Sequence, residues 1–220
     1  MRAPSLILVL ICCTAFTACN KMRNPQVKGS GNETTQQRTI GDFSRLEVNG
    51  TYSVSVRCGS SPSLTLTGDD NLLPLVKTEI RNATLKIYSE QSLSSHTPVA
   101  VILGVESLSN VEADGASTVH IENDSTNELS LNINGSGTME AAGVARYGEY
   151  TINGSGTFAV DQLKAREVSI TVNGAGTATV YASESLEASV IGTGTVNFYG
   201  NPQHVKRNIT GIGSIVKMNP

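Results

Sequence analysis

Asn134-Gly135-Ser136-Gly137-Thr138 recurs as Asn153-Gly154-Ser155-Gly156-Thr157 and again as Asn173-Gly174-Ala175-Gly176-Thr177. A weaker copy precedes these phrases at 114–118, and two more follow at 191–195 and 210–214. The first glycines of the six copies are spaced by 18 to 20 residues, at Gly115, Gly135, Gly154, Gly174, Gly192 and Gly211. A near-constant period of this length predicts a repeat architecture.

Apolar residues recur at fixed distances from each first glycine. The position two residues before it is occupied by Ala113, Ile133, Ile152, Val172, Val190 and Ile209. The position four residues after it is occupied by Val119, Met139, Phe158, Ala178, Val196 and Ile215. Polar residues alternate with these, and the spacings of three and four that a helix needs are missing. The period of two predicts strand, turn and strand, each strand with one buried face.

A single repeat of this kind cannot bury its own apolar face, but stacked repeats place like residues above like residues, about 4.8 Å apart. We therefore predict an all-β fold, a single-stranded parallel β-helix (β-solenoid) of six coils of about 19 residues each. A right-handed sense is expected because parallel strand crossovers almost always have it.

The glycines and asparagines of the repeats are assigned to the corners of the coils. Glycine tolerates the positive φ that a tight bend requires, and we expect this of the second glycine of each pair as well as the first. The second glycines are Gly137, Gly156, Gly176, Gly194 and Gly213. Asn134, Asn153 and Asn173 can bond their own turns and each other along the stack. This ridge of polar side chains either binds a ligand along the stack or only stabilises the turns, and its recurrence favours a role in the turns.

Residues 1–18 have the pattern of a signal peptide, with Arg2 near the start, an apolar run over 6–11 and small residues before Cys19. The pattern resembles a bacterial lipoprotein signal, which implies that Cys19 is the lipidated first residue of the mature chain. An ordinary secretory signal and a short membrane anchor are the alternatives, although the apolar run is short for crossing a bilayer.

Residues 19–38 are polar, contain Pro25, Gly29 and Gly31, and lack an apolar period, so they predict a flexible tether. Residues 39–220 are assigned to one domain, because no charge run or Pro/Gly-rich linker divides them. Cys58 is the one cysteine left in that domain, and we expect it to be a small buried residue.

The first half of the domain predicts less regular β structure that is continuous with the solenoid. Strands are expected at 43–56 and 64–67, a short helical turn or strand at 72–76, and a hairpin or sharp corner over 79–88. The nearly continuous apolar run at 99–105 predicts a strand buried on both faces. In the last coil, Arg207 and Lys217 occupy positions that are apolar in earlier coils, which is typical of the polar end of a stack.

Taken together, the strand at 43–56, the 68–71 turn, the segments at 85–87 and 99–115 and the repeated Asn-Gly-Ser-Gly-Thr phrases resemble the GIN domain. This is the head domain described for putative autotransporter adhesins and is common in Bacteroidetes lipoproteins. The resemblance covers roughly 39–199 and implies a single-stranded right-handed β-helix. It carries over no catalytic or ligand-binding residue.

Motifs for catalysis are weak in this sequence. Gly-Ser-Gly resembles part of a nucleophile elbow, but its serine is replaced by Ala175 in the third copy, as expected for a small residue that only has to fit a turn. The three histidines, His96, His120 and His204, have no metal-ligand spacing. The acids of the coils, such as Glu112 and Glu140, show no clustering in columns. We therefore expect no catalytic residue, no metal and no cofactor.

The chain has 16 basic and 19 acidic residues, a balance that disfavours nucleic acid as a partner. The expected function is that of a non-catalytic, lipid-anchored protein of the cell envelope, in the outer membrane. It would be an adhesin or binding module that presents a repetitive β surface to a glycan or protein. The alternative is a polysaccharide-active β-helix enzyme, lyase or hydrolase, with its site within 72–98. Orientation to the periplasm or the cell surface stays open, as does the oligomeric state.

Overall fold

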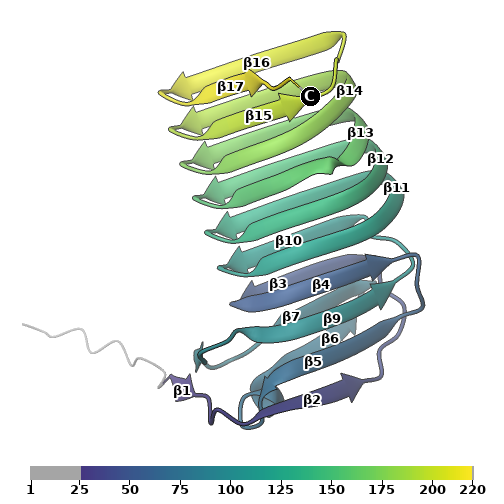
Figure 1. Ribbon diagram of the computed structural model, residues 1–220, viewed down its shortest axis with the longest axis vertical. Coiled ribbons are helices and arrows are strands. Elements are labelled where there is room, and N and C mark those ends of the chain that lie inside the picture. Colours follow the sequence, from purple (N-terminus) through teal and green to yellow (C-terminus); the bar gives the residue numbers. More distant parts are fainter. Residues whose placement is uncertain (1–25, 220) are drawn as a thin grey trace, which may run out of the picture.

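The computed structural model describes residues 26–219, which form β strands and one 3-10 turn (Figure 1). Their bounds are β1 Val27–Lys28, β2 Glu33–Arg38, β3 Arg45–Gly50, β4 Tyr52–Cys58, β5 Ser63–Asp69, η1 Leu73–Leu75, β6 Lys77–Arg81, β7 Thr84–Tyr88, β8 Leu93–Ser94, β9 Val99–Val105, β10 Asn110–Gly115, β11 Thr118–Gly135, β12 Thr138–Gly154, β13 Thr157–Gly174, β14 Thr177–Gly192, β15 Thr195–Tyr199, β16 His204–Gly211 and β17 Ser214–Lys217. All but β1 and β8 join one sheet.

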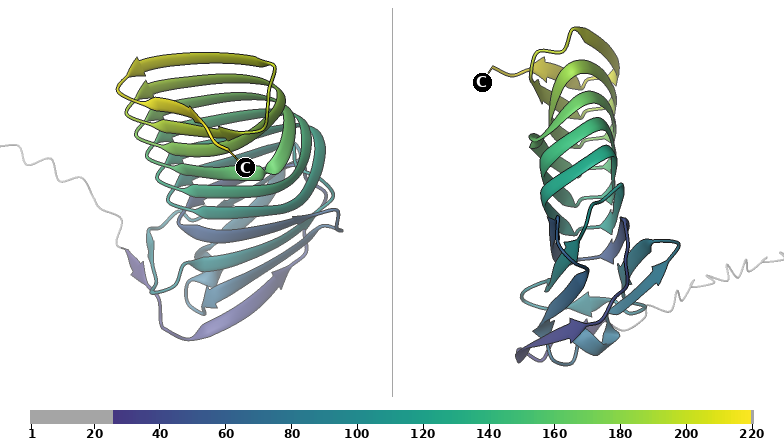
Figure 2. Two further views of the ribbon diagram at one scale, coloured as in Figure 1. Left: turned by 45° about the horizontal axis from the view of Figure 1, so that its top comes forward. Right: turned by 90° about the vertical axis from the view of Figure 1, so that its right-hand side faces the viewer.

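The sheet winds into the predicted β-solenoid, so the fold class is confirmed. Each of the long strands β11 to β14 runs along one layer, bends, and returns along the other before it ends at a glycine corner (Figure 1). The six predicted corners delimit five complete turns, one fewer than the six coils expected. In Figure 2 (left), the chain runs counter-clockwise as it rises toward the C-terminal end, which is the right-handed sense.

Parallel pairing stacks the repeats in strict register through the corners. Asn134, for example, pairs with Asn153 of the next coil, and Gly135 pairs with Gly154. The predicted apolar columns therefore lie one above another between the two layers (Figure 2, right). Ile133, Phe158 and Val180 in these columns are completely buried. The bend opposite the corners is less regular, with shifts of register such as the one between Ile121 and Asp124.

The spatial order of the coils differs from their order in the sequence. Strands β3 and β4 form a coil with its own corner at Gly50, and this coil lies directly beneath β10 and β11. The chain then leaves the stack after β4, builds β5 to β9 at the N-terminal end, and returns at β10 (Figure 1). Strands β7 and β9 pair beneath β3 and β4, so the irregular half is continuous with the solenoid.

The N-terminal end of the stack is formed by antiparallel strands. Strand β2 pairs with β5, and β6 pairs with β7 around a turn in which Asn82 and Ala83 have positive φ. The Arg38 guanidinium donates to the carbonyl oxygens of Val76, at 2.7 Å, and Leu73, at 2.9 Å. The predicted tether is therefore wrong over 33–38, where an exposed polar edge strand lacks the apolar period that would reveal it.

Two expectations about burial are corrected. Strand β9 is not buried on both faces, because Ile102 on its outward side is 57% exposed. Ile209 continues an apolar column but is 45% exposed, because it lies in the last coil of the described residues. Cys58 is buried, as predicted. The segment at 72–76 contains the short helical turn η1.

Candidate functional site

The first glycine of each of the six repeated corners has a backbone conformation that disfavours other residues. Their φ values lie between +113° and +136°, in the region that L side chains rarely adopt. The carbonyl oxygen of each first glycine accepts the N–H of the residue after the first glycine of the next coil, as in Ser155 N to Gly135 O at 2.9 Å. A Cβ on Gly174 would meet the carbonyl oxygen of Gly154 well inside van der Waals contact. These glycines therefore let the corners stack as closely as the strands do.

The second glycines are required for a different reason from the one expected. Gly137, Gly156, Gly176, Gly194 and Gly213 do not have positive φ. Instead, each lies against the coil beneath it. A Cβ on Gly156 would be 2.6 Å from Cγ2 of Ile133 and 3.0 Å from the carbonyl oxygen of Gly137. The second position must be small because the apolar core passes directly under it.

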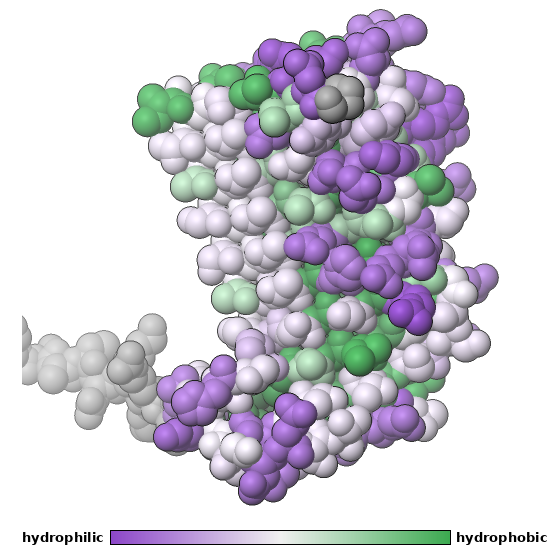
Figure 3. All heavy atoms as spheres, viewed as in Figure 1, coloured by the Kyte–Doolittle hydropathy of each residue, from purple (hydrophilic) through white to green (hydrophobic). Residues whose placement is uncertain are grey.

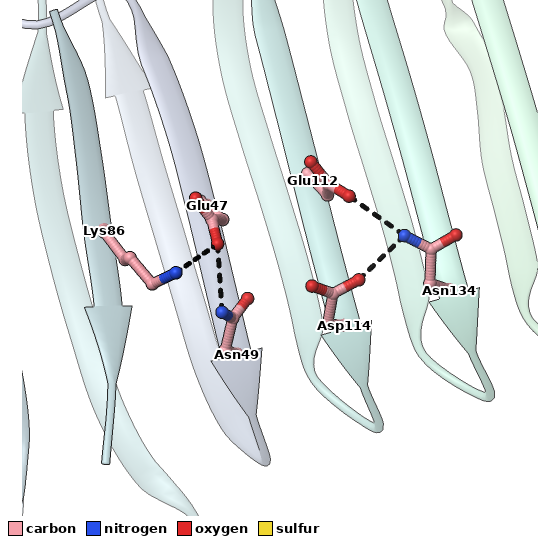
Figure 4. A network of polar contacts seen from close by, with 6 residues as sticks. All are labelled: Glu47, Asn49, Lys86, Glu112, Asp114 and Asn134. Atoms are coloured by element: carbon pink, nitrogen blue, oxygen red, sulfur yellow. Dashed lines mark hydrogen bonds and ion pairs between the residues drawn. The ribbon is translucent and has the colours of Figure 1, made fainter. Parts of the chain in front are cut away.

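The asparagines that precede the corners form a ladder of side-chain amides along the stack. The Nδ2 of Asn173 donates to Oδ1 of Asn153 at 2.8 Å, and Asn153 donates in the same way to Asn134 at 2.9 Å. Asn134 then donates to Asp114 at 2.7 Å and to Glu112 at 3.0 Å (Figure 4). The ladder thus runs in one direction and ends on carboxylates, which makes the ridge a structural feature of the corners as well as a polar surface.

Next to the end of this ladder, β3, β7 and β10 present a charged face. We call it the acidic face, after Glu47, Glu112 and Asp114. Lys86 Nζ donates to Glu47 Oε1 at 2.6 Å, and Asn49 Nδ2 donates to the same oxygen at 3.0 Å (Figure 4). The hydrogen bond from Lys86 lowers the pKa of Glu47. Glu112 has a raised pKa, because burial disfavours its charged form and the Asp114 and Glu47 carboxylates lie nearby.

The sequence did not indicate this cluster: the acids of the regular coils form no column of their own, and the partner of Glu112 is Glu47, from the less regular half. Glu47 and Glu112 are far apart in the sequence but lie side by side, because β3 pairs with β10. The Asn49-Gly50 corner was the available signal: aligning it with the later corners places Glu47 in the column of Glu112. Two shallow hollows, of about 640 and 480 Å³, adjoin at Arg45 and Glu47. The face can therefore accept hydrogen bonds from a polar ligand.

The other layer carries a smaller polar group. His120 Nδ1 lies 3.1 Å from Oε2 of Glu140, and its Nε2 lies 3.2 Å from Oε1 of Glu122. Glu140 comes from the neighbouring coil and Glu122 from the same strand, so the stacking again gathers groups that the sequence separates. Within residues 26–219, no set of three or more His, Cys, Asp or Glu side chains is arranged to hold a metal ion.

Cys58 lies at the irregular bend near the buried Asp124, whose Oδ2 has no hydrogen-bond partner among the described residues. Burial, together with the Asp124 carboxylate, raises the pKa of Cys58 to about 12. Burial also raises the pKa of Asp124, whose Oδ1 accepts the N–H of Leu108 at 3.2 Å. A thiol with so high a pKa is a poor nucleophile at neutral pH.

The predicted signal peptide and its lipidation residue, Cys19, lie outside the described residues. The part of the chain that the structure describes contains no helix with the length and apolar character needed to cross a membrane.

Comparison with known proteins gives the same family that the sequence resembles. The family model described as "putative auto-transporter adhesin, head GIN domain" matches residues 42–202. No curated protein matches the chain. A putative adhesin from Bacteroides fragilis has a similar crystal structure, with a TM-score of 0.71 and 21% identity, covering 87% of this chain and all of that one.

Two structures from Parabacteroides distasonis are also similar. One, described as a putative lipid binding protein, has a TM-score of 0.56 at 21% identity, covering 89% of this chain and all of that one. The other, described as a putative adhesin, has a TM-score of 0.53 at 22% identity, covering 88% of this chain and all of that one. At such identities the structures support the fold alone. The family model spans most of the chain, and this protein therefore belongs to the head GIN domain family of adhesin-like proteins.

Proposed function

We propose that this protein is a non-catalytic, lipid-anchored binding module of the cell envelope. The observation that carries the proposal is the repetition of its outer surface: outward side chains lie in register from coil to coil and are mostly polar (Figure 3). Such a surface offers the same groups again and again along the stack, which suits an extended or repetitive partner. Membership of an adhesin-like family supports the same function.

The anchor would be Cys19, followed by a short tether. The first described residues lie at the end of the stack opposite to the C-terminal coil (Figure 1). A lipid on Cys19 would therefore hold the N-terminal end near the outer membrane and direct β16 and β17 away from it. This arrangement is the reason to expect that the ligand meets the side and the distal end of the solenoid.

The acidic face is the part of the side surface best suited to a ligand. Its carboxylates and the neighbouring Lys86 offer both hydrogen-bond acceptors and a donor over two hollows. A glycan, with hydroxyl groups spaced along a chain, or a basic protein segment fits this chemistry. The structural relative described as lipid binding makes lipid a further class to include in a ligand screen.

Localisation is the first experiment. Intact cells are treated with protease, and the solenoid is followed with an antibody, beside a Cys19→Ala strain in which the lipid cannot be attached. Loss of antibody signal on intact cells, together with release of the Cys19→Ala protein from the membrane, is the expected result. Protection from protease would place the protein in the periplasm and contradict a role in adhesion. Unchanged membrane attachment of Cys19→Ala would contradict the assignment of Cys19 as the anchor.

The alternative, a polysaccharide-active enzyme, now has one specific observation in its favour. Glu112, with its raised pKa beside Asp114, has the character of a general acid beside a carboxylate. We expect no turnover of uronic-acid or neutral polysaccharides by the purified chain. Turnover that Glu112→Gln abolishes, with folding unchanged, would replace the binding function with a catalytic one.

A further inference from the structure

The two ends of the solenoid are built differently. At the N-terminal end the outermost strands, β2 and β6, run antiparallel to their neighbours, and the edge strand β2 is polar and exposed. At the C-terminal end, β16 pairs only with β14, and β17 pairs only with β15. Within residues 26–219, no strand covers the outer edge of either one (Figure 1). Their outward N–H and C=O groups are therefore free to pair with another chain.

This open end is also apolar. Four of the large hydrophobic residues with high exposure lie in the last coil: Val205 at 40%, Ile209 at 45%, Ile212 at 86% and Val216 at 43%. Val205 and Ile209 belong to columns that are buried in the coils below, where Leu186 and Val190 occupy the same positions. The end thus exposes the top of the core instead of covering it with polar side chains.

The charged side chains of the last coil are all cationic. After Glu187, the chain contains no aspartate or glutamate, but it contains Lys206, Arg207 and Lys217. Lys206 pairs with Glu187 at 2.5 Å, whereas Arg207 lies over the Phe198 ring, with its Cζ 5.3 Å from the ring centroid. The guanidinium of Arg207 therefore lies across the open core and keeps its planar hydrogen-bonding edge for a carboxylate.

From these three properties we infer that the C-terminal end is a docking site for an extended acidic peptide segment, which adds a strand to β16. Backbone pairing would supply the affinity, and apolar side chains on one face of the segment would cover Val205 and Ile209. Aspartate or glutamate between these apolar side chains, on the same face, would pair with Arg207, which lies between Val205 and Ile209. A second copy docked through the same end is a poor occupant, because it would bring its own Lys206 and Arg207 against these cations.

The inference goes beyond the proposed function, since it concerns a different surface and holds with or without a lipid on Cys19. In an anchored molecule this end would be the part farthest from the membrane. The partner would be a protein with an exposed acidic strand or an unstructured acidic segment.

The test uses the full chain and a fluorescein-labelled peptide of eight residues, Ser-Thr-Val-Thr-Glu-Thr-Val-Thr, followed by fluorescence anisotropy. Its two valines and the glutamate between them lie on one face of a strand, as Val205, Arg207 and Ile209 do on β16. We expect saturable binding, and none by a counterpart with lysine in place of glutamate. A third peptide, N-methylated at every second residue, keeps the charges but cannot pair along one edge, and its affinity should fall at least about tenfold. Equal binding of the N-methylated peptide, or binding of the lysine peptide, would overturn strand addition.

Two variants locate the site on the chain. Arg207→Glu should weaken binding of the glutamate peptide by at least about tenfold, as for loss of a buried charge pair. The matched control is Arg57→Glu, a reversal of another exposed arginine in a coil distant from β16, and it should change nothing. Undiminished binding by Arg207→Glu would remove the site from this end. Binding to phosphatidylglycerol vesicles without any peptide binding would assign the surface to a membrane instead.

Discussion

Four glycine-to-alanine substitutions separate the two reasons for glycine in the corners. Gly174 combines positive φ, +126°, with close approach to the carbonyl oxygen of Gly154. Gly156 has the close approach without the positive φ. Gly31 has positive φ, +84°, with no atom within 4 Å of an added Cβ. Gly41 has neither, and is the control.

The expected free-energy changes follow from these geometries. Positive φ costs a side chain about 1–3 kcal/mol. Overpacking against a fixed neighbour costs about a further 1–3 kcal/mol. Gly174→Ala should therefore lower the free energy of unfolding by about 2–6 kcal/mol, because both costs apply. Gly31→Ala and Gly156→Ala should each lose about 1–3 kcal/mol, and Gly41→Ala should be neutral or stabilising by up to about 1 kcal/mol.

Urea unfolding followed by circular dichroism measures these differences, with thermal melts as a second probe. For a chain of this size a loss of 1 kcal/mol lowers Tm by about 2–4 °C, so Gly174→Ala should melt about 10 °C below the parent. The reasoning fails if Gly174→Ala costs no more than Gly31→Ala, since the close stacking of the corners would then contribute nothing. A neutral Gly156→Ala would show that Ile133 moves aside.

Four further predictions concern the core and the irregular bend. Phe158→Asp should abolish cooperative unfolding because it buries an unpaired charge. Thr179→Asp, at an outward position, should lower the free energy of unfolding by less than about 1 kcal/mol. Equal losses would mean that the inward and outward positions of the strands are assigned wrongly. Tyr150→Phe should stabilise the fold by about 1 kcal/mol in urea unfolding, because the buried Tyr150 hydroxyl has no hydrogen-bond partner among residues 26–219; a loss would show that a partner exists. The pKa of Asp124 is raised in the folded state, so the native carboxyl keeps its proton to higher pH than the unfolded one, and the free energy of unfolding falls as pH rises from about 3.8 through the folded pKa. Asp124→Asn should remove this dependence of the free energy of unfolding on pH. The same pH dependence in Asp124→Asn would exclude Asp124 as its cause. Cys58 should resist thiol labelling at neutral pH until the chain unfolds, and fast labelling of the native protein would contradict its burial.

The regular coils could be predicted because each residue column repeats. The alternation around Gly135, Gly154 and Gly174 gave the buried faces, and the glycines located the bends. The repeat period did not show why the second position of each corner must be a small residue. Gly156 is constrained by Ile133 of the coil beneath, and this contact depends on how closely the coils stack. A sequence pattern describes a residue's own backbone better than it describes the side chain below it.

The irregular half was harder to predict because its contacts join segments distant in the sequence. Strand β2 is polar and exposed, so no apolar period distinguishes it from a tether, and only its pairing with β5 makes it a strand. The coil of β3 and β4 lies beneath a coil formed some 60 residues later, and no fixed spacing marks that neighbour. The acidic face was missed for this reason, since Glu47 meets Glu112 only through that pairing.

A strictly repetitive sequence also leaves the ends of a stack unspecified, because every coil offers the same upper and lower edge to the next. Residues that break the repeat must end it. At the N-terminal end the break is a long excursion, from β5 to β9, and the outermost strands there, β2 and β6, run antiparallel to their neighbours. At the C-terminal end the break consists of substitutions within a coil: Arg207 and Lys217 replace apolar residues, but Val205 and Ile209 do not change in character. The cations would repel a like copy docked through the same end, whereas the apolar side chains beside them suit a partner that covers them. The two ends therefore differ in the way that the proposed docking of a partner at the C-terminal end requires.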